Sequence, residues 1–294
     1  MKMQNFNVCA ILINYRKADL TMRCIESLIG QVQFICVVDN SACDAEFNLM
    51  KKHIQSLQSV YEDVAIKLLY PAMNLGFGAG VQYGLDYIHS RRDLCFKAIL
   101  LINNDAVAHN GMVNLMLQKL QMHHYKAVVA PRLKDEFPSS VFWYHRISGI
   151  MLKRPFPGAF PYLTGACIML PAELTRKKET LFDPEFFMYG EDIEFAWYLH
   201  RAGIPMIQVP AAEFDHQGSA SAPHGEFFYE YHVTRMHILL ARKLAKNRME
   251  AAILLLGRAF ALPLRALRRA FRQKSLVPVY ALMAAWAGKP GRRL

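Results

Sequence analysis

The sequence predicts an α/β fold, in which a mostly parallel sheet is flanked by helices and followed by a basic helical extension. Short apolar runs alternate with helical patterns along the first two-thirds of the chain. A half-exposed strand shows alternating apolar and polar residues, and these runs lack that alternation. Continuous apolar runs are typical of strands buried on both faces of a parallel sheet. Positive charge gathers in the last fifth of the chain.

We expect strands and helices to alternate from residue 8 to residue 131. The expected strands comprise residues 8–14, 34–39, 64–70, 97–105 and 126–131. The expected helices comprise residues 19–31, 45–58, 81–90 and 111–124. Because a helix follows each of the first four strands, we expect helices on both sides of the sheet.

The second half of the chain is less regular. Proline, glycine and aromatic residues dominate residues 132–160, which indicates a long ordered loop or a small subdomain near a site. Residues 164–170 resume strand character, and residues 191–203 form a helical pattern. A last strand-like run covers residues 204–210.

Composition limits the class of protein. The chain has 294 residues and 53% apolar content, enough for one or two domains with a large core. The six cysteines lack CxxC spacing and several stand in apolar runs, so we expect buried free thiols in a reducing compartment. The N-terminal apolar run is short, and no run reaches the about 18 residues of a membrane span, so we expect neither a secretory signal nor a spanning helix.

The C-terminal region is strongly basic. Residues 235–294 hold 14 Lys and Arg and a single acid, Glu250, whereas the rest of the chain holds 21 Lys and Arg and 23 acids. Apolar residues recur there at steps of three and four, at Leu256, Phe260, Leu264, Leu267 and Phe271. We expect a basic amphipathic helix on an anionic membrane surface, kinked or divided at Pro263. The alternative is a helix that packs on the catalytic body and keeps its arginines in solvent. The many apolar residues on one face of the helix disfavour a nucleic-acid partner.

Polar residues follow several of the expected strands. They are Asn14 and Tyr15, Asp39, Asn104 and Asp105, and His216. Each alone is also a common cap or turn residue. Ligands of open parallel sheets bind at the carboxyl ends of the strands, so their convergence there favours a site. Asp105 suits a divalent cation, with His216 as a conditional second ligand.

Two acidic residues open the helical pattern that follows Gly190. Negative charge at Glu191 and Asp192 favours the helix dipole, which is a sufficient structural reason for them. The functional alternative makes one of the two a general base beside a bound hydroxyl. Trp197, further along the same helix, is either a core residue or a platform for a sugar ring.

The stretch NLGFGAG, residues 74–80, joins a strand to a helix and suggests a nucleotide site. A dinucleotide fingerprint needs G-x-G-x-x-G in the first strand–helix turn. Here Gly76, Gly78 and Gly80 give G-x-G-x-G after the third strand, and the first turn has no glycine. A nucleotide-dependent oxidoreductase stays an alternative on these glycines alone.

An ordered set of segments resembles glycosyltransferase family 2, in its non-processive, rhamnosyltransferase-like branch. The segments are VCAILINYRKADL, VVDNSACD, NLGFGAG, LLINNDA, TGACIML, FDPEFFMYGEDIEFAWYLHRAG and HQGSAS, within residues 7 to 245. The resemblance implies a GT-A type, Rossmann-like fold that binds a nucleotide-sugar and a divalent metal, Mg or Mn. It implies a catalytic domain over residues 1–225 and a helical, basic, membrane-associating region over residues 226–294.

The resemblance also implies roles for single residues. Those on the donor side are Asn14, Tyr15, Asp39, Asn74, Gly76, Gly78 and Asn104, with Asp39 on a pyrimidine base. Asp105 and His216 match the metal ligands, although Asn103 stands where an acid often stands. Asp192 matches the catalytic base, with Glu191 as its neighbour. Gly165 and Trp197 fall on the acceptor side.

The function implied is the inverting transfer of a single sugar. We expect a UDP- or dTDP-sugar donor, with dTDP-rhamnose as one candidate, and a hydroxyl of a lipid-linked glycan as acceptor. Bacterial cell-surface polysaccharide assembly, on the cytoplasmic face of the membrane, is the expected setting. A catalytically decayed binding or scaffold protein is a further alternative, motivated by Asn103 and Tyr198.

Overall fold

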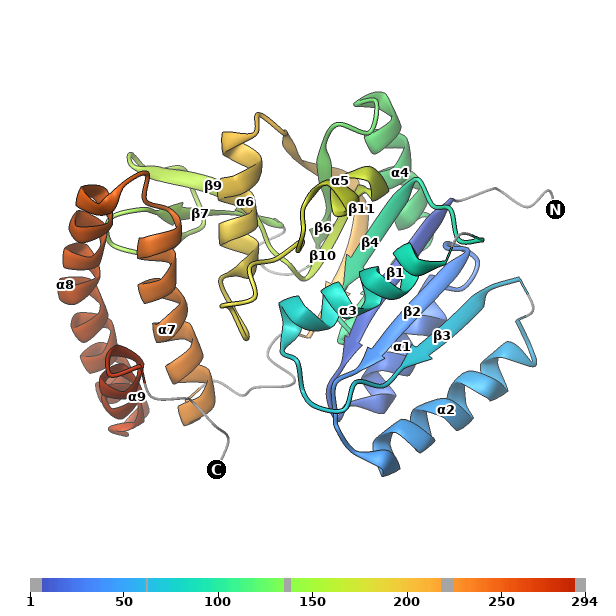
Figure 1. The fold of residues 1–294 in the computed structure, drawn as a ribbon, viewed down its shortest axis with the longest axis horizontal. Helices are drawn as coiled ribbons and strands as arrows, with labels where there is room; N and C mark the ends of the chain where they lie inside the picture. Colours follow the sequence, from blue (N-terminus) through green and yellow to red (C-terminus); the bar gives the residue numbers. More distant parts are fainter. Residues whose placement is uncertain (1–6, 62, 92, 135–138, 218–224, 289–294) are drawn as a thin grey trace.

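The computed structural model describes residues 7–61, 63–91, 93–134, 139–217 and 225–288. Its main sheet contains β1 (Val8–Asn14), β2 (Phe34–Asp39), β3 (Ala65–Leu69), β4 (Ala98–Ile102), β5 (Ala106–Ala108), β6 (Val128–Leu133), β10 (Cys167–Pro171) and β11 (Met206–His216). These eight strands lie in the order β3-β2-β1-β4-β10-β6-β11-β5 (Figure 1). The strands expected before residue 131 are all present.

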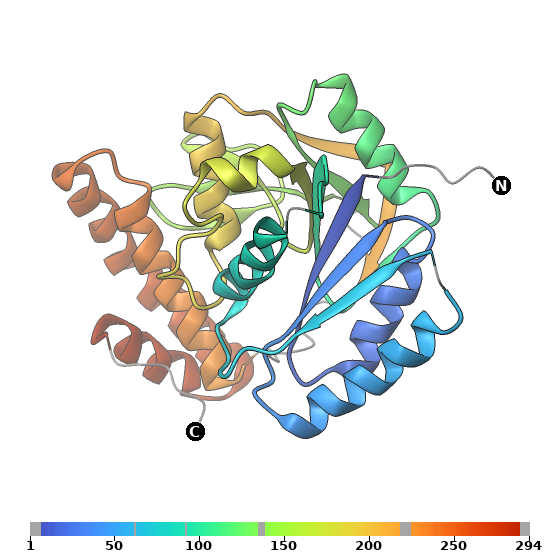
Figure 2. The same ribbon diagram turned by 45° about the vertical axis from the view of Figure 1, so that its right-hand side comes forward.

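Helices cover both faces of this sheet, as expected. They are α1 (Ala18–Leu28), α2 (Asp44–Gln58), α3 (Phe77–Ser90), α4 (Met112–Met122), α5 (Ala172–Lys177) and α6 (Glu191–Arg201). The buried residues of α1, α2 and α4 form one apolar core with the sheet, and those of α3, α5 and α6 form a second core on the opposite face. Figure 2 shows α3 on one side of β1–β3 and α1 and α2 on the other.

Most neighbouring strands in the main sheet are parallel, and two strands run the other way. β10 is antiparallel to both β4 and β6, and β5 is antiparallel to β11. The start of β10 therefore lies at the edge where β4 ends, with Cys167 opposite Ile102. Just before β10, the carbonyl oxygen of Ala166 accepts a hydrogen bond of 2.8 Å from the backbone N–H of Asn103. This reversal brings residues 164–166 into the edge where parallel strands end.

The aromatic stretch over residues 132–160 contains part of a small second sheet. Its strands are β7 (Val141–His145), β8 (Met151–Leu152) and β9 (Ala159–Leu163), in the antiparallel order β8-β7-β9. Tyr144, Phe160 and Tyr162 of this sheet pack with α6 and with α7 (Phe227–Lys243) in a third apolar core. The small sheet thus supports α6, which carries Glu191 and Asp192.

Two further helices follow, α8 (Arg248–Gln273) and α9 (Val277–Trp286), beside α7 at the left of Figure 1. α8 continues through Pro263, so the proline does not divide it. Arg258 of α8 is fully buried and donates hydrogen bonds to the carbonyl oxygens of Arg146, Ile147 and His237, which fastens α8 to the body. Within the described ranges, no helix combines the length and apolar character needed to cross a membrane.

Candidate active site

A half-open cavity of about 330 Å³ lies at the ends of β1 and β4, between the loop before α3 and the start of α6. Its volume falls in the range of small-molecule sites. The structure brings nine of the predicted site residues to its wall: Tyr15, Asn74, Gly76, Asn104, Asp105, Gly165, Glu191, Asp192 and His216. Four others do not line it: Asn14, Asp39, Gly78 and Trp197.

Asp192 is held at the start of α6 by two backbone donors. The N–H of Gly165 donates to its Oδ2 at 3.2 Å, and the N–H of Ile193 donates to its Oδ1 at 2.9 Å. Gly190 caps the helix with φ +91°, a left-handed conformation that glycine adopts without strain, and this turn directs the next two residues toward the cavity. Burial raises the pKa of Asp192, and the backbone donors oppose that rise.

Glu191 lies beside Asp192 in a more strongly desolvated position. Burial raises the pKa of Glu191, and the neighbouring carboxylate of Asp192 raises it further. Its Oε2 is buried and has no hydrogen-bond partner within the described residues. The two carboxyl groups therefore disfavour being ionised together, and the better hydrogen-bonded Asp192 is the one that more readily carries the charge.

A second group of polar side chains lies at the end of β4. Nε2 of His216 is 3.0 Å from Oδ1 of Asp105 and 3.2 Å from Nδ2 of Asn103. No cluster of three or more Asp, Glu, His or Cys side chains suited to a metal occurs in the part of the chain described. One carboxylate and one imidazole suit an ion that takes its other ligands from a diphosphate and water. Asp105 and His216 thus fit a shared metal site and not a fully protein-enclosed one.

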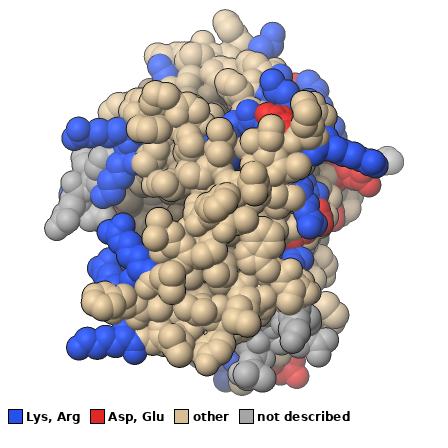
Figure 3. Space-filling model, turned by 90° about the vertical axis from the view of Figure 1, so that its left-hand side faces the viewer, with Lys and Arg blue, Asp and Glu red and all other residues tan. Residues whose placement is uncertain are grey.

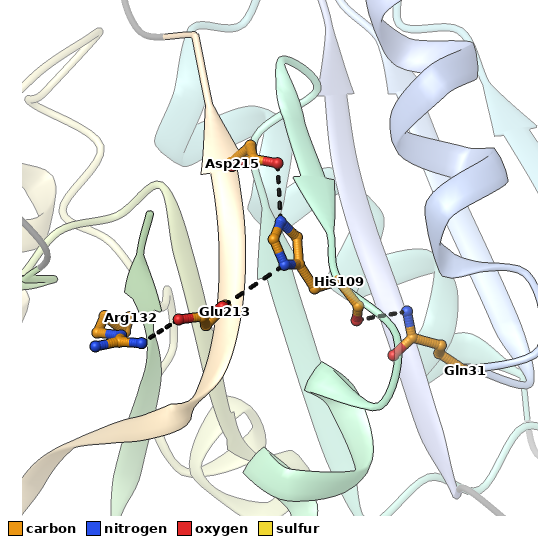
Figure 4. A network of polar contacts seen from close by, with 5 residues as sticks. All are labelled: Gln31, His109, Arg132, Glu213 and Asp215. Carbon is orange, nitrogen blue, oxygen red and sulfur yellow. Dashed lines mark hydrogen bonds and ion pairs between the residues drawn. The ribbon is translucent and has the colours of Figure 1, made fainter. Parts of the chain in front are cut away.

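The position of His216 depends on a polar network at the edge of the sheet (Figure 4). His109 lies between Asp215, at 2.8 Å, and Glu213, at 3.8 Å, and Glu213 also pairs with Arg132 of β6. These contacts tie β5 and β6 to β11. In the resulting register, His216 is opposite Ala106, the residue after Asp105.

Behind the cavity lies a buried hydrogen-bond network built on the ends of β1 and β2. Nδ2 of Asn14 donates to Oδ1 of Asp39 at 2.9 Å, and Oδ1 of Asn14 accepts from Thr21 at 2.8 Å. The hydroxyl of Thr21 in turn accepts a hydrogen bond of 3.0 Å from Nδ2 of Asn104, and Asn104 lines the cavity. Oδ2 of Asp39 is buried with no partner among the described residues, so it can accept one further hydrogen bond.

The glycine segment differs from its expected form. Helix α3 begins at Phe77 and not at residue 81, so Gly78 and Gly80 lie inside it. A Cβ on Gly78 would be 3.1 Å from Phe182, which explains this glycine by helix packing. Gly76 directly precedes the helix and has φ +80°. Its carbonyl oxygen accepts a hydrogen bond of 2.7 Å from Nδ2 of Asn40.

Trp197 is part of the core beneath the small sheet. The residue is 8% exposed, and its ring packs against Phe160, with ring centroids 5.0 Å apart. The guanidinium of Arg146 covers the ring at 4.4 Å. Of the two interpretations of Trp197, core residue or platform for a sugar ring, the structure supports the core residue, and Trp197 does not line the cavity. Gly165, the other residue expected on the acceptor side, does line it.

Sequence reasoning missed several residues of the cavity wall. These are Ile13, Phe77, Thr164, Ala166, Met188 and Tyr189, whereas Asn40, which also lines the wall, was expected among the polar residues that end the second strand. Tyr189 has φ +66°, unusual for a residue with a side chain, and it stands directly before Gly190. The segment FMYGED indicates the site through its two acids, but Met188 and Tyr189 carry no charge and give no sequence signal of their own. Residues 218–221 of the HQGSAS segment lie outside the described residues.

Comparisons with known proteins identify the family of the chain and solved structures that share its fold. The family described as "Glycosyltransferase like family 2" matches residues 7–236, and the chain belongs to it. The chain is thus a member of a glycosyltransferase family, and its sheet and flanking helices are those of the GT-A fold. No curated protein matches the sequence.

Two solved structures share the fold at low identity. The chain is similar to GalNAc-T7 with UDP, GalNAc and Mn²⁺, with a TM-score of 0.58 at 12% identity over 78% of this chain and 47% of that one. It is also similar to the mannosyltransferase PcManGT from Pyrobaculum calidifontis in complex with GDP-Man and Mn²⁺, with a TM-score of 0.58 at 14% identity over 97% and 76%. The chain thus spans less than half of the first of these structures.

Proposed function

We propose that the protein transfers a single sugar from a nucleotide-sugar to an acceptor hydroxyl with inversion, and that Asp192 is the general base. One observation carries this proposal. Asp192, fixed by backbone donors, and the Asp105–His216 pair line the same cavity. A base and a group that binds the leaving diphosphate are the two components that direct displacement at an anomeric carbon requires.

Asp192 would receive the proton of the acceptor hydroxyl as that oxygen attacks the anomeric carbon. The hydrogen bond from Gly165 keeps Oδ2 oriented, and burial makes the carboxylate more basic than an aspartate in water. One displacement with no covalent intermediate inverts the centre. Glu191, with the higher pKa, would keep its proton and limit repulsion in the pair.

Asp105 and His216 would hold the divalent metal, Mg or Mn, together with the donor diphosphate. The bound ion would stabilise negative charge on the departing nucleoside diphosphate. Both structural neighbours were solved with Mn²⁺, which supports this assignment. Asn103 contributes an amide where a second carboxylate would bind the ion more strongly, so we propose a metal held largely by the substrate.

The donor is proposed to be a UDP- or dTDP-sugar, with dTDP-rhamnose as one candidate. The free Oδ2 of Asp39 supports a pyrimidine, whose ring N–H could donate to it. Asn14, Thr21 and Asn104 would fix this carboxylate relative to the cavity. Asn74 and Gly76 would bring backbone close to the donor.

The acceptor is proposed to be a lipid-linked glycan at the cytoplasmic face of a bacterial membrane. Support comes from α8, whose outward side chains include Phe260, Leu264 and Phe271, exposed by 74%, 70% and 89%. Such exposure of large apolar side chains is typical of a surface that meets another apolar phase. We propose that residues 1–225 carry catalysis and that residues 226–294 associate with the membrane.

Thermal unfolding with UDP, dTDP, GDP or NAD, each with and without manganese, tests this function. We expect UDP or dTDP to raise the melting temperature, and manganese to increase the shift. In the Asp105→Asn variant, the nucleotide should still raise the melting temperature, but manganese should no longer increase that shift. Stabilisation by NAD alone would instead support the oxidoreductase alternative, and no shift with any nucleotide would support the decayed scaffold.

A further inference from the structure

Four arginines gather on one side of α8 near its C-terminal end. Arg265, Arg268, Arg269 and Arg272 recur at helical spacing and, with Gln273, line an open cavity of about 580 Å³. No acidic residue follows Glu250 in the sequence. This cavity is separate from the one that holds Asp192.

Only one carboxylate offsets these charges among the residues described. Glu230 of α7 is 1% exposed and lies 2.5 Å from Arg269 and 3.8 Å from Arg265. Gln273 also donates to Glu230, at 3.1 Å. Arg268 and Arg272 are exposed and have no ion pair in the described part of the chain. The cluster therefore keeps three uncompensated positive charges within about two helical turns.

Concentrated positive charge of this kind is unfavourable without an anion. Burial lowers the pKa of Arg265, and the nearby Arg269 lowers it further, whereas Glu230 opposes both effects. Phosphate oxygens match the planar donor geometry of guanidinium groups and are bound by two parallel hydrogen bonds. A phosphate ester or diphosphate is thus the ligand chemistry that suits the cluster.

The neighbouring surface indicates what bears the phosphate. Leu264 directly precedes Arg265 in the sequence, Leu267 and Phe271 lie between the arginines, and all three are 61% exposed or more. Figure 3 shows a broad face without charged side chains, bordered on its left by Lys and Arg and on its right by both basic and acidic residues. In Figures 1 and 2, the C-terminal end of α8 lies on the same lower side as the ends of β1 and β2, where the first cavity lies.

We propose that the arginine cluster of α8 is a binding site for the phosphate groups of membrane lipids, and that it docks the adjacent apolar face onto an anionic bilayer. A second copy of this chain is a poorer occupant, because it would place a second set of arginines against the first. A soluble phosphate would leave the apolar face exposed. The proposal deepens the membrane association proposed above and does not depend on the transfer reaction.

Vesicle co-sedimentation of the full chain tests the site. The vesicles are phosphatidylcholine alone, or phosphatidylcholine with phosphatidylglycerol or with phosphatidic acid, whose phosphate monoester is the better mimic of a terminal lipid phosphate. We expect binding to both anionic vesicles, tighter with phosphatidic acid at equal vesicle charge. The double variant Arg268→Ala/Arg272→Ala should bind them about 30-fold more weakly, because each arginine near an anionic surface contributes on the order of 1 kcal/mol.

The matched control is Arg23→Ala/Arg201→Ala, which removes the same charge from exposed positions on α1 and α6. It should bind vesicles nearly as the natural chain does. An equal loss in both variants, or unchanged binding by Arg268→Ala/Arg272→Ala, would overturn the proposal. Full displacement from vesicles by a modest excess of inorganic diphosphate, with no preference for lipid, would instead make this a site for soluble anions.

Two further variants test whether the apolar face takes part in vesicle binding and whether that binding is independent of the proposed catalysis. Phe260→Ser/Phe271→Ser should also weaken vesicle binding, because it removes exposed apolar surface, and should leave the melting temperature unchanged. Retained binding in that variant would contradict docking through the apolar face. Asp192→Asn should bind vesicles as the natural chain does, so a failure of the proposed catalysis would leave this test intact.

Discussion

The backbone N–H of Gly165 donates a hydrogen bond of 3.2 Å to Oδ2 of Asp192. This contact joins the segment before β10 to the first turn of α6 and fixes the carboxylate at the cavity wall. It exists because β10 runs antiparallel to β4, which brings its N-terminal end to the edge where the parallel strands finish. The proposed base is thus positioned by the main sheet and by α6 together.

The rate of transfer should fall as the pH is lowered, and the midpoint of this fall should lie well above the usual pKa range of an aspartate. Burial raises the pKa of Asp192, and the base acts only when deprotonated, so protonation on lowering the pH removes activity. The measurement is kcat/KM against pH at saturating manganese. An acid limb centred near the ordinary aspartate value of about 3.9 would contradict a desolvated base.

Glu191→Gln should stabilise the fold, and the gain should grow as pH rises. The pKa of Glu191 is raised in the folded state, so folding favours its protonated form and the carboxylate destabilises the protein as pH climbs from the unfolded toward the folded pKa. An amide never carries that charge, and we expect a gain on the order of 1–3 kcal/mol above that window. Denaturant unfolding at several pH values measures it. Glu179→Gln, at an exposed position, is the control and should change little.

Asn103→Asp should tighten manganese binding in the presence of UDP. Its side chain already lies 3.2 Å from His216, so a carboxylate there would add a charged oxygen ligand beside Asp105. Titration of free Mn²⁺ by electron paramagnetic resonance measures the affinity. Asn114→Asp on α4 adds the same charge elsewhere and should have no effect. Equal affinity in all three proteins would place the metal away from the end of β4.

Gly76→Ala should destabilise the protein more than Gly111→Ala. Both glycines have positive φ, +80° and +79°, so each substitution costs on the order of 1–2 kcal/mol in backbone strain. A Cβ on Gly76 would also lie 2.2 Å from the carbonyl oxygen of Phe187, whereas a Cβ on Gly111 meets no atom within 4 Å. Chemical denaturation compares the two. Similar losses would mean that the contact with Phe187 does not constrain the cavity wall.

Local sequence patterns predicted most of the sheet, and these patterns together with the family resemblance predicted nine residues of the cavity wall. Apolar runs identify β1, β2 and β4 because these strands are buried on both faces. The direction of β10 was not predictable, since its five residues are all buried and its apolar pattern is the same in either direction. Helix α3 began earlier than expected because Gly78 and Gly80 allow close packing inside a helix, which their usual role as breakers conceals.

The burial of single side chains such as Arg258 and Trp197 could not be predicted from the sequence. Arg258 stands in the sequence among the arginines of α8 but is fully buried and bonded to backbone carbonyls. The sequence left Trp197 open between a core residue and a sugar platform, and in the structure it fills the core under Arg146. In both cases Arg146, more than fifty residues away in the sequence, is a partner, and only the tertiary fold reveals it.

Transfer by Asp192→Asn tests the central claim most directly. The variant keeps the shape of the side chain and removes its basicity. With the donor sugar found by a mass-spectrometric screen against a lipid-linked acceptor mixture, we expect single-turnover transfer to fall at least about 100-fold, while the melting-temperature shift with nucleotide and manganese is retained. Transfer at the natural rate, with unchanged nucleotide binding, would show that Asp192 is not the base.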